Sequence, residues 1–181
     1  MALRRILTEG NETYEYPWYY FVDDDDNYTQ VVKNLKDVRT VSNVDDLKNA
    51  VQKLEPGGAT AADYGMTKVK YIYGAGNSAY VPGTAEKKRN KVVILFTDGD
   101  PTYNDGFETA VANNTIAAAK VLKDSGAVIY TVGLLDSCNE DIYNYMSYVS
   151  SKYPTAVSLD APGSDSASGD YFFYVTSSEG L

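Results

Sequence analysis

Histidine is absent from this chain of 181 residues. Its absence excludes catalysis by serine–histidine or cysteine–histidine pairs, and it excludes zinc sites built on imidazole. The single cysteine, Cys138, cannot form a disulfide within the chain, so the fold is expected to need no such cross-link. No apolar stretch approaches the roughly 20 residues of a membrane-spanning helix, and we expect no membrane insertion by this segment.

Basic residues are outnumbered by acidic ones, 16 Lys and Arg against 25 Asp and Glu, which gives a net charge of −9 at pH 7. An acidic surface repels the phosphates of nucleic acids and of anionic membranes, so neither is expected as a partner. The acidic charge suits the binding of divalent cations, or simply a solvated acidic surface. Asp23 to Asn27 carries four consecutive carboxylates, but it lacks the spacing and the glycine of a calcium loop, and we interpret it as a solvated loop.

The stretch around which the chain is organised is the apolar run Val92 to Phe96 and the polar segment after it. An apolar run of this length predicts a strand that is buried on both faces of a parallel sheet. It is followed by Thr97-Asp98-Gly99-Asp100-Pro101-Thr102. Ligands bind at the carboxyl ends of such strands, so Asp98 is a candidate ligand-binding residue. Asp-Gly and Asp-Pro are also ordinary turn sequences, so a plain turn remains an alternative.

The hydrophobic pattern predicts alternating helices and strands over most of the chain. Apolar residues recurring every three or four positions predict helices near 44–54, 60–73, 107–125 and 139–152. Strands are predicted near 92–96, 127–133 and 171–175, with further strands over 2–7 and 16–22. This order predicts an α/β fold, a doubly wound, mostly parallel sheet flanked by helices, in a single domain over 1–181.

Three spaced motifs give the chain a family resemblance. Gly58-Ala59-Thr60 starts a predicted helix that continues with Asp63-Tyr64-Gly65-Met66, and two strands end in Phe96-Thr97-Asp98-Gly99 and Tyr130-Thr131-Val132-Gly133-Leu134. Their order and spacing resemble a von Willebrand factor type A domain over residues 40–181. The later stretch from Tyr145 to Pro154 is similar to the version found in surface and pilus proteins of Gram-positive bacteria.

The resemblance implies a Mg²⁺ ion at a metal-ion-dependent adhesion site, with Thr60 and Asp98 as metal ligands. It also implies a protein partner, a host-matrix protein or another surface protein, whose acidic residue completes the shell of hard oxygen ligands that magnesium prefers. The family's first strand ends in Asp-x-Ser-x-Ser, and this pattern is absent from the chain. We therefore expect an N-terminally truncated domain without its first strand and first helix, a weak, hydrated Mg²⁺ site, and a chain that is unstable or self-associates when made alone.

The function expected from the resemblance is that of a non-enzymatic adhesion module, a fragment of an adhesin or pilin on the outer surface of a bacterial cell. The alternative is a Mg²⁺-dependent phosphatase, because Asp98-Gly99-Asp100-Pro101-Thr102 also resembles the haloacid-dehalogenase motif. There Asp98 would attack phosphorus and Asp100 would act as general acid and base. A third alternative is a structural domain that binds no metal. The phosphatase hypothesis does not account for Gly58-Ala59-Thr60, which favours the adhesion hypothesis.

Overall fold

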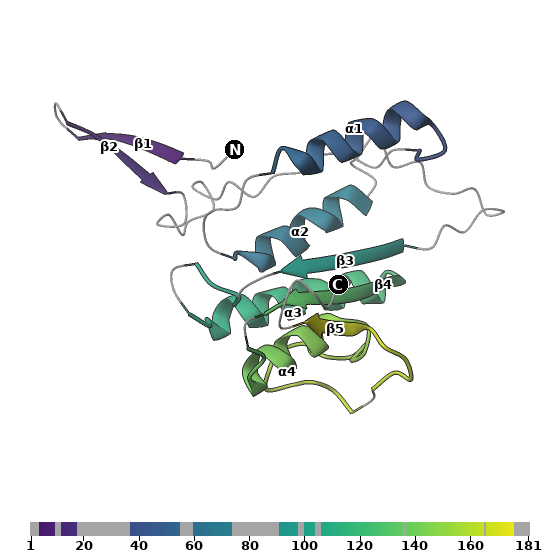
Figure 1. The fold of residues 1–181 in the computed structure, drawn as a ribbon. Helices are drawn as coiled ribbons and strands as arrows, with labels where there is room; N and C mark the ends of the chain where they lie inside the picture. Colours follow the sequence, from purple (N-terminus) through teal and green to yellow (C-terminus); the bar gives the residue numbers. More distant parts are fainter. Residues whose placement is uncertain are drawn as a thin grey trace.

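The computed structural model describes residues 4–9, 12–17, 37–54, 60–73, 91–97, 100–103, 106–135, 137–164 and 166–175. The elements in chain order are β1 (Arg4–Glu9), β2 (Glu12–Pro17), α1 (Val41–Gln52), α2 (Ala62–Tyr73), β3 (Lys91–Thr97), α3 (Thr109–Asp124), β4 (Ala127–Leu134), α4 (Glu140–Val149) and β5 (Phe172–Val175) (Figure 1). The four predicted helices and the three predicted strands of the main sheet are confirmed to within a few residues at each end.

The main sheet contains β3, β4 and β5 in that order, and both strand pairs are parallel. Lys91 is in register with Ala127, and Thr131 is in register with Phe172. Helix α3 connects β3 to β4, and α4 connects β4 to β5. The strands follow one another in chain order and such crossovers are right-handed, so both helices lie on the same face of the sheet. They pack against each other and against β4, with α3 behind the strands in the view of Figure 1. The α/β sheet flanked by helices is thereby confirmed.

The hydrophobic core lies between the sheet and these two helices. Helix α3 contributes a fully or almost fully buried stripe: Val111, Ala112, Thr115, Ile116, Ala119 and Leu122. Facing it are Val93 and Ile129 from the strands and Tyr145 and Met146 from α4. The buried Thr131 hydroxyl donates a 3.0 Å hydrogen bond to the carbonyl of Met146, so its polar atom is satisfied within the core.

The opposite face of β3 is open, which corrects one prediction. Val93 and Thr97 are buried, but Val92, Ile94 and Phe96 are exposed, Ile94 by 65% and Phe96 by 55%. The strand is therefore not buried on both faces. Both crossover helices lie on the other face, and the apolar run reflected the β preference of its side chains rather than two covered faces.

A separate two-stranded sheet pairs β1 with β2 in antiparallel orientation, with Glu9 opposite Glu12. The strand predicted over 2–7 is thus confirmed in a shifted position. The strand predicted over 16–22 overlaps only the last two residues of β2, because residues 12–15 also pair with β1 in the ladder. Backbone pairing with β1 outweighs the weak strand preference of this polar segment. Residues 18–22 lie outside the described part of the chain.

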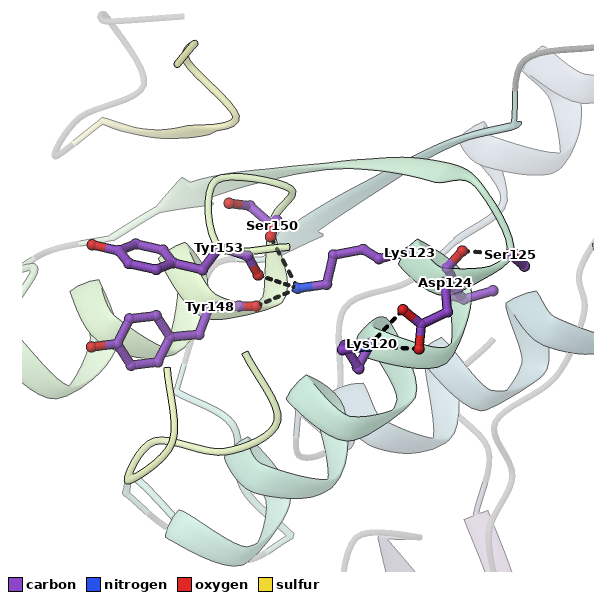
Figure 2. A network of polar contacts seen from close by, with 8 residues as sticks. Lys120, Lys123, Asp124, Ser125, Tyr148, Ser150 and Tyr153 are labelled. Carbon is purple, nitrogen blue, oxygen red and sulfur yellow. Dashed lines mark hydrogen bonds and ion pairs between the residues drawn. The ribbon is translucent and has the colours of Figure 1, made fainter. Parts of the chain in front are cut away.

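Lys123 joins the end of α3 to the end of α4 (Figure 2). Its ammonium group donates hydrogen bonds to the carbonyl oxygens of Tyr148 at 2.8 Å, Ser150 at 3.2 Å and Tyr153 at 2.8 Å. Burial, together with the nearby charge of Lys120, lowers the pKa of Lys123 to about 8. At pH 7 the group therefore still carries three protons, one for each carbonyl. This lysine provides a donor to the Tyr148 carbonyl in the last turn of α4 and to two carbonyls, those of Ser150 and Tyr153, just after the helix ends.

Candidate metal and ligand site at the sheet edge

Thr60 lies two residues before α2, which begins at Ala62. Its carbonyl oxygen accepts hydrogen bonds from the backbone N–H of Ala62 at 2.8 Å and of Thr102 at 3.1 Å. The second bond ties the start of α2 to the segment that follows β3, at the edge of the sheet where ligands bind in α/β folds. The Thr60 side chain is partly exposed, and its hydroxyl makes no hydrogen bond with the described residues. It is therefore free to act as a ligand.

The segment after β3 is held in place by the start of α3. Glu108 accepts hydrogen bonds at one carboxylate oxygen from the Thr102 hydroxyl at 2.9 Å and from the Tyr103 N–H at 2.8 Å. The N–H of Glu108 donates in return to the carbonyl of Pro101 at 2.9 Å. These bonds fix the segment opposite Thr60. Asp98, the second predicted metal ligand, lies outside the described residues, so its approach to Thr60 remains a prediction.

Asp63, in the first turn of α2, is the site residue that the sequence reasoning missed. Its side chain is only 7% exposed. Oδ2 accepts a hydrogen bond from the Tyr103 hydroxyl and lies 3.5 Å from the amide nitrogen of Asn114. Oδ1 has no hydrogen-bond partner among the described residues. The signal in the sequence was its position three residues before the buried Met66, because a carboxylate at this spacing belongs to the packed face of the helix.

The hydrogen bond between Tyr103 and Asp63 is strongly polarised. Burial, and then the contact with the Asp63 carboxylate, raise the pKa of Tyr103 well above its usual value. The phenol therefore keeps its proton and acts as a donor over the whole ordinary pH range. This phenol, together with the weak Asn114 contact, gives the carboxylate its only hydrogen bonds within the described part of the chain.

A pocket of about 490 Å³ opens between α2 and α3 beside this carboxylate. Asp63, Tyr64, Tyr103 and Asn114 provide its polar lining, and side chains that include Ala117 and Val121 provide an apolar wall. The rings of Tyr64 and Tyr103 have centroids 5.8 Å apart and are tilted by 53°. We call this cavity the Asp63 pocket.

The residues at the sheet edge suit a hard divalent cation by their donor chemistry. A threonine hydroxyl and carboxylate oxygens are ligands that Mg²⁺ accepts, usually together with several waters. Among the described residues, however, no three carboxylate, cysteine or histidine side chains come together as a complete metal cluster. The protein part of a metal shell formed by Thr60 and Asp98 would therefore be small.

The sequence profile of the von Willebrand factor type A domain matches residues 23–179, a range that includes Thr60, Asp98 and every element from α1 to β5. Searches of curated proteins and of solved structures found no match. The profile match gives no support to the phosphatase alternative. Within the described ranges, no helix has the length and apolarity needed to cross a membrane.

Proposed function

The chain belongs to the von Willebrand factor type A domain family, and on that premise we propose that it is a non-enzymatic adhesion module whose ligand binding depends on a metal ion. Domains of this family are protein-interaction modules. The binding surface that we propose is the carboxyl edge of the sheet, around Thr60 and the segment after β3. The observation that carries the proposal is the hydrogen bond between the Thr60 carbonyl and the Thr102 N–H, because it brings two distant parts of the sequence together there.

The metal that we propose is Mg²⁺, held by the Thr60 hydroxyl and the Asp98 carboxylate. Bound there, the ion would supply an electrophilic centre for an acidic side chain of the partner. A hydroxyl ligand adds no negative charge, and with few carboxylates around it the ion keeps its attraction for a further anion. The absence of Asp-x-Ser-x-Ser leaves few protein ligands, so we expect the ion to bind weakly without the partner.

We propose further that the module is extracellular and belongs to an adhesin or pilin on the surface of a Gram-positive bacterium. The support for this is the resemblance of the stretch from Tyr145 to Pro154. In the fold this stretch forms the C-terminal half of α4 and the turn that Lys123 holds. The single cysteine is compatible with an oxidising exterior, because the described core packs without a disulfide.

Selection of random peptides displayed on phage against the immobilised chain tests this function. The selection is run in parallel with Mg²⁺ and with EDTA. We expect peptides to be enriched only in the selection with Mg²⁺, and we expect the enriched peptides to share an Asp or a Glu. Replacing that acidic residue by Asn or Gln should abolish binding of the peptide. Asp98→Ala should also abolish binding, whereas Asp124→Asn, on the exposed end of α3, should not. Enrichment that is equal in EDTA, or peptides without a shared acidic residue, would contradict the proposal.

A further inference from the structure

We propose that the Asp63 pocket binds a cationic side chain, the guanidinium of an arginine or the ammonium of a lysine, presented by a protein partner. Thr60 is not among the described residues that line the pocket. The assignment of the cation to a protein rests on the proposed function.

Asp63 carries a charge that no described residue compensates. The carboxylate is buried to more than nine-tenths, and no Lys or Arg in the described ranges pairs with it. Removing a carboxylate from water is costly unless hydrogen bonds or an opposite charge replace the lost hydration. A cation that enters the pocket would supply the missing charge, and the carboxylate would favour it over a neutral ligand of the same shape.

The same carboxylate also has unused hydrogen-bonding capacity. An ionised carboxylate can accept about four hydrogen bonds. Asp63 has one firm donor, the Tyr103 hydroxyl, while the Asn114 amide lies at 3.5 Å, the outer limit of a hydrogen bond. Asn114 is itself exposed, so an incoming donor can displace its amide without unpacking the core. Ammonium groups bring three donors and guanidinium groups five.

The rest of the pocket lining is mostly aromatic and apolar. The faces of tyrosine rings attract cations within about 6 Å, and Tyr64 and Tyr103 lie together beside the carboxylate. Ala117 and Val121 offer an apolar wall to the methylene stem that a lysine or arginine side chain carries. An anionic ligand would meet both the Asp63 carboxylate and the net charge of −9. The pocket therefore has a place for each part of a long basic side chain.

The position of the pocket relates it to the sheet-edge site. Asp63 is three residues after Thr60, and Tyr103 directly follows Thr102, whose N–H bonds to the Thr60 carbonyl. A partner segment with an acidic and a basic residue could thus bind the sheet-edge site and the Asp63 pocket at the same time. This combination would select among acidic ligands that the metal alone would not distinguish.

The test uses small probes in EDTA, so that it is independent of any metal. Nα-acetyl-arginine amide and Nα-acetyl-lysine amide are titrated into the ¹⁵N-labelled chain, and Nα-acetyl-citrulline amide serves as the neutral control. We expect saturable shifts of the Asn114 side-chain amide with either or both cations, with a Kd on the order of 1 mM. The neutral probe should cause no shift. Comparing the titrations with the arginine and lysine probes shows whether the pocket binds guanidinium, ammonium or both.

Two variants and a control decide the interpretation. Asp63→Asn should weaken cation binding by at least about tenfold, which corresponds to ~1.4 kcal/mol, whereas Asp124→Asn should bind like the wild type. Val121→Lys places a resident ammonium on the pocket wall and should block the probes with the fold intact, even if Asp63→Asn does not fold. Equal shifts with the citrulline probe, or unchanged cation binding in Val121→Lys, would overturn the proposal. The Mg²⁺-dependent peptide selection can fail or succeed independently of this result.

Discussion

Lys123→Met removes the link between the ends of α3 and α4 and should destabilise the domain. Methionine fills a similar volume with an unbranched apolar side chain, so the change deletes the ammonium group with little loss of packing. Three carbonyl oxygens, those of Tyr148, Ser150 and Tyr153, lose their donor together. Ser150 is fully buried, so water cannot replace the donor there without movement of the turn.

The expected loss is about 2 kcal/mol of the free energy of unfolding. Each hydrogen bond contributes roughly 0.5–1.5 kcal/mol net, which gives about 2–4 kcal/mol for three. The substitution also relieves the cost of burying the ammonium, which is the main reason that the pKa of Lys123 is lowered to about 8. This relief places the expected value at the lower end of the range.

Urea denaturation followed by circular dichroism at pH 7 measures this loss. Lys120→Met is the matched control, because Lys120 lies one turn earlier on α3 and pairs with the exposed Asp124. Such a surface pair contributes about 0.3–0.5 kcal/mol. If Lys123→Met and Lys120→Met were equally stable within about 0.5 kcal/mol, an amount typical of substitutions at neutral surface positions, the three carbonyl contacts would have no structural role and the reasoning would be refuted.

Three further predictions concern the pH dependence of stability, the open face of the sheet and the phosphatase alternative. Because the pKa of Lys123 falls from 10.5 to about 8 on folding, the unfolded chain binds more protons between these pH values. The stability difference between wild type and Lys123→Met should therefore grow as pH rises from 8 to 10.5, by at most about 1.4 kcal/mol per pH unit; a constant difference in urea titrations would contradict the lowered pKa. Ile94 lies on the exposed face of β3, so Ile94→Lys should lower the free energy of unfolding by less than about 1 kcal/mol. Ile129 is fully buried, so Ile129→Lys should prevent cooperative unfolding in the same assay. The chain should release no phosphate from p-nitrophenyl phosphate in Mg²⁺, and a release that Asp98→Asn abolishes would restore the phosphatase hypothesis.

Periodicity was sufficient to predict where the helices and the parallel strands lie, but not how deeply each is buried: α3 has a buried apolar side, whereas α1 buries no residue. Val111, Ala119 and Leu122 recur at helical spacing, and all three are buried in α3. The error at β3 has a physical cause. An apolar run indicates that its residues favour a strand. Which face of that strand is covered depends on the side of the sheet on which the crossover helices lie.

The candidate site was predictable in part. The motifs around Thr60 and after β3 indicated where the chain should bind a ligand, and the Thr60–Thr102 hydrogen bond brings these two segments together. The role of Asp63 could not be read from its type, since an aspartate in the first turn of a helix is commonly a partner of the helix dipole. Its burial depends on contacts with Tyr103 and Asn114, which are 40 and 51 residues away in the sequence.

Calorimetric titration of Mg²⁺ tests the proposed metal dependence most directly, with wild type, Thr60→Val, Asp98→Ala and Asp100→Asn as samples. Thr60→Val removes the hydroxyl at nearly constant shape, and Asp100→Asn controls for binding to the acidic surface in general. The account predicts weak, saturable binding to the wild type and to Asp100→Asn, and binding weaker by at least about tenfold, ~1.4 kcal/mol, in Thr60→Val and Asp98→Ala. Equal Mg²⁺ binding in all four proteins, or none in the wild type, would contradict it.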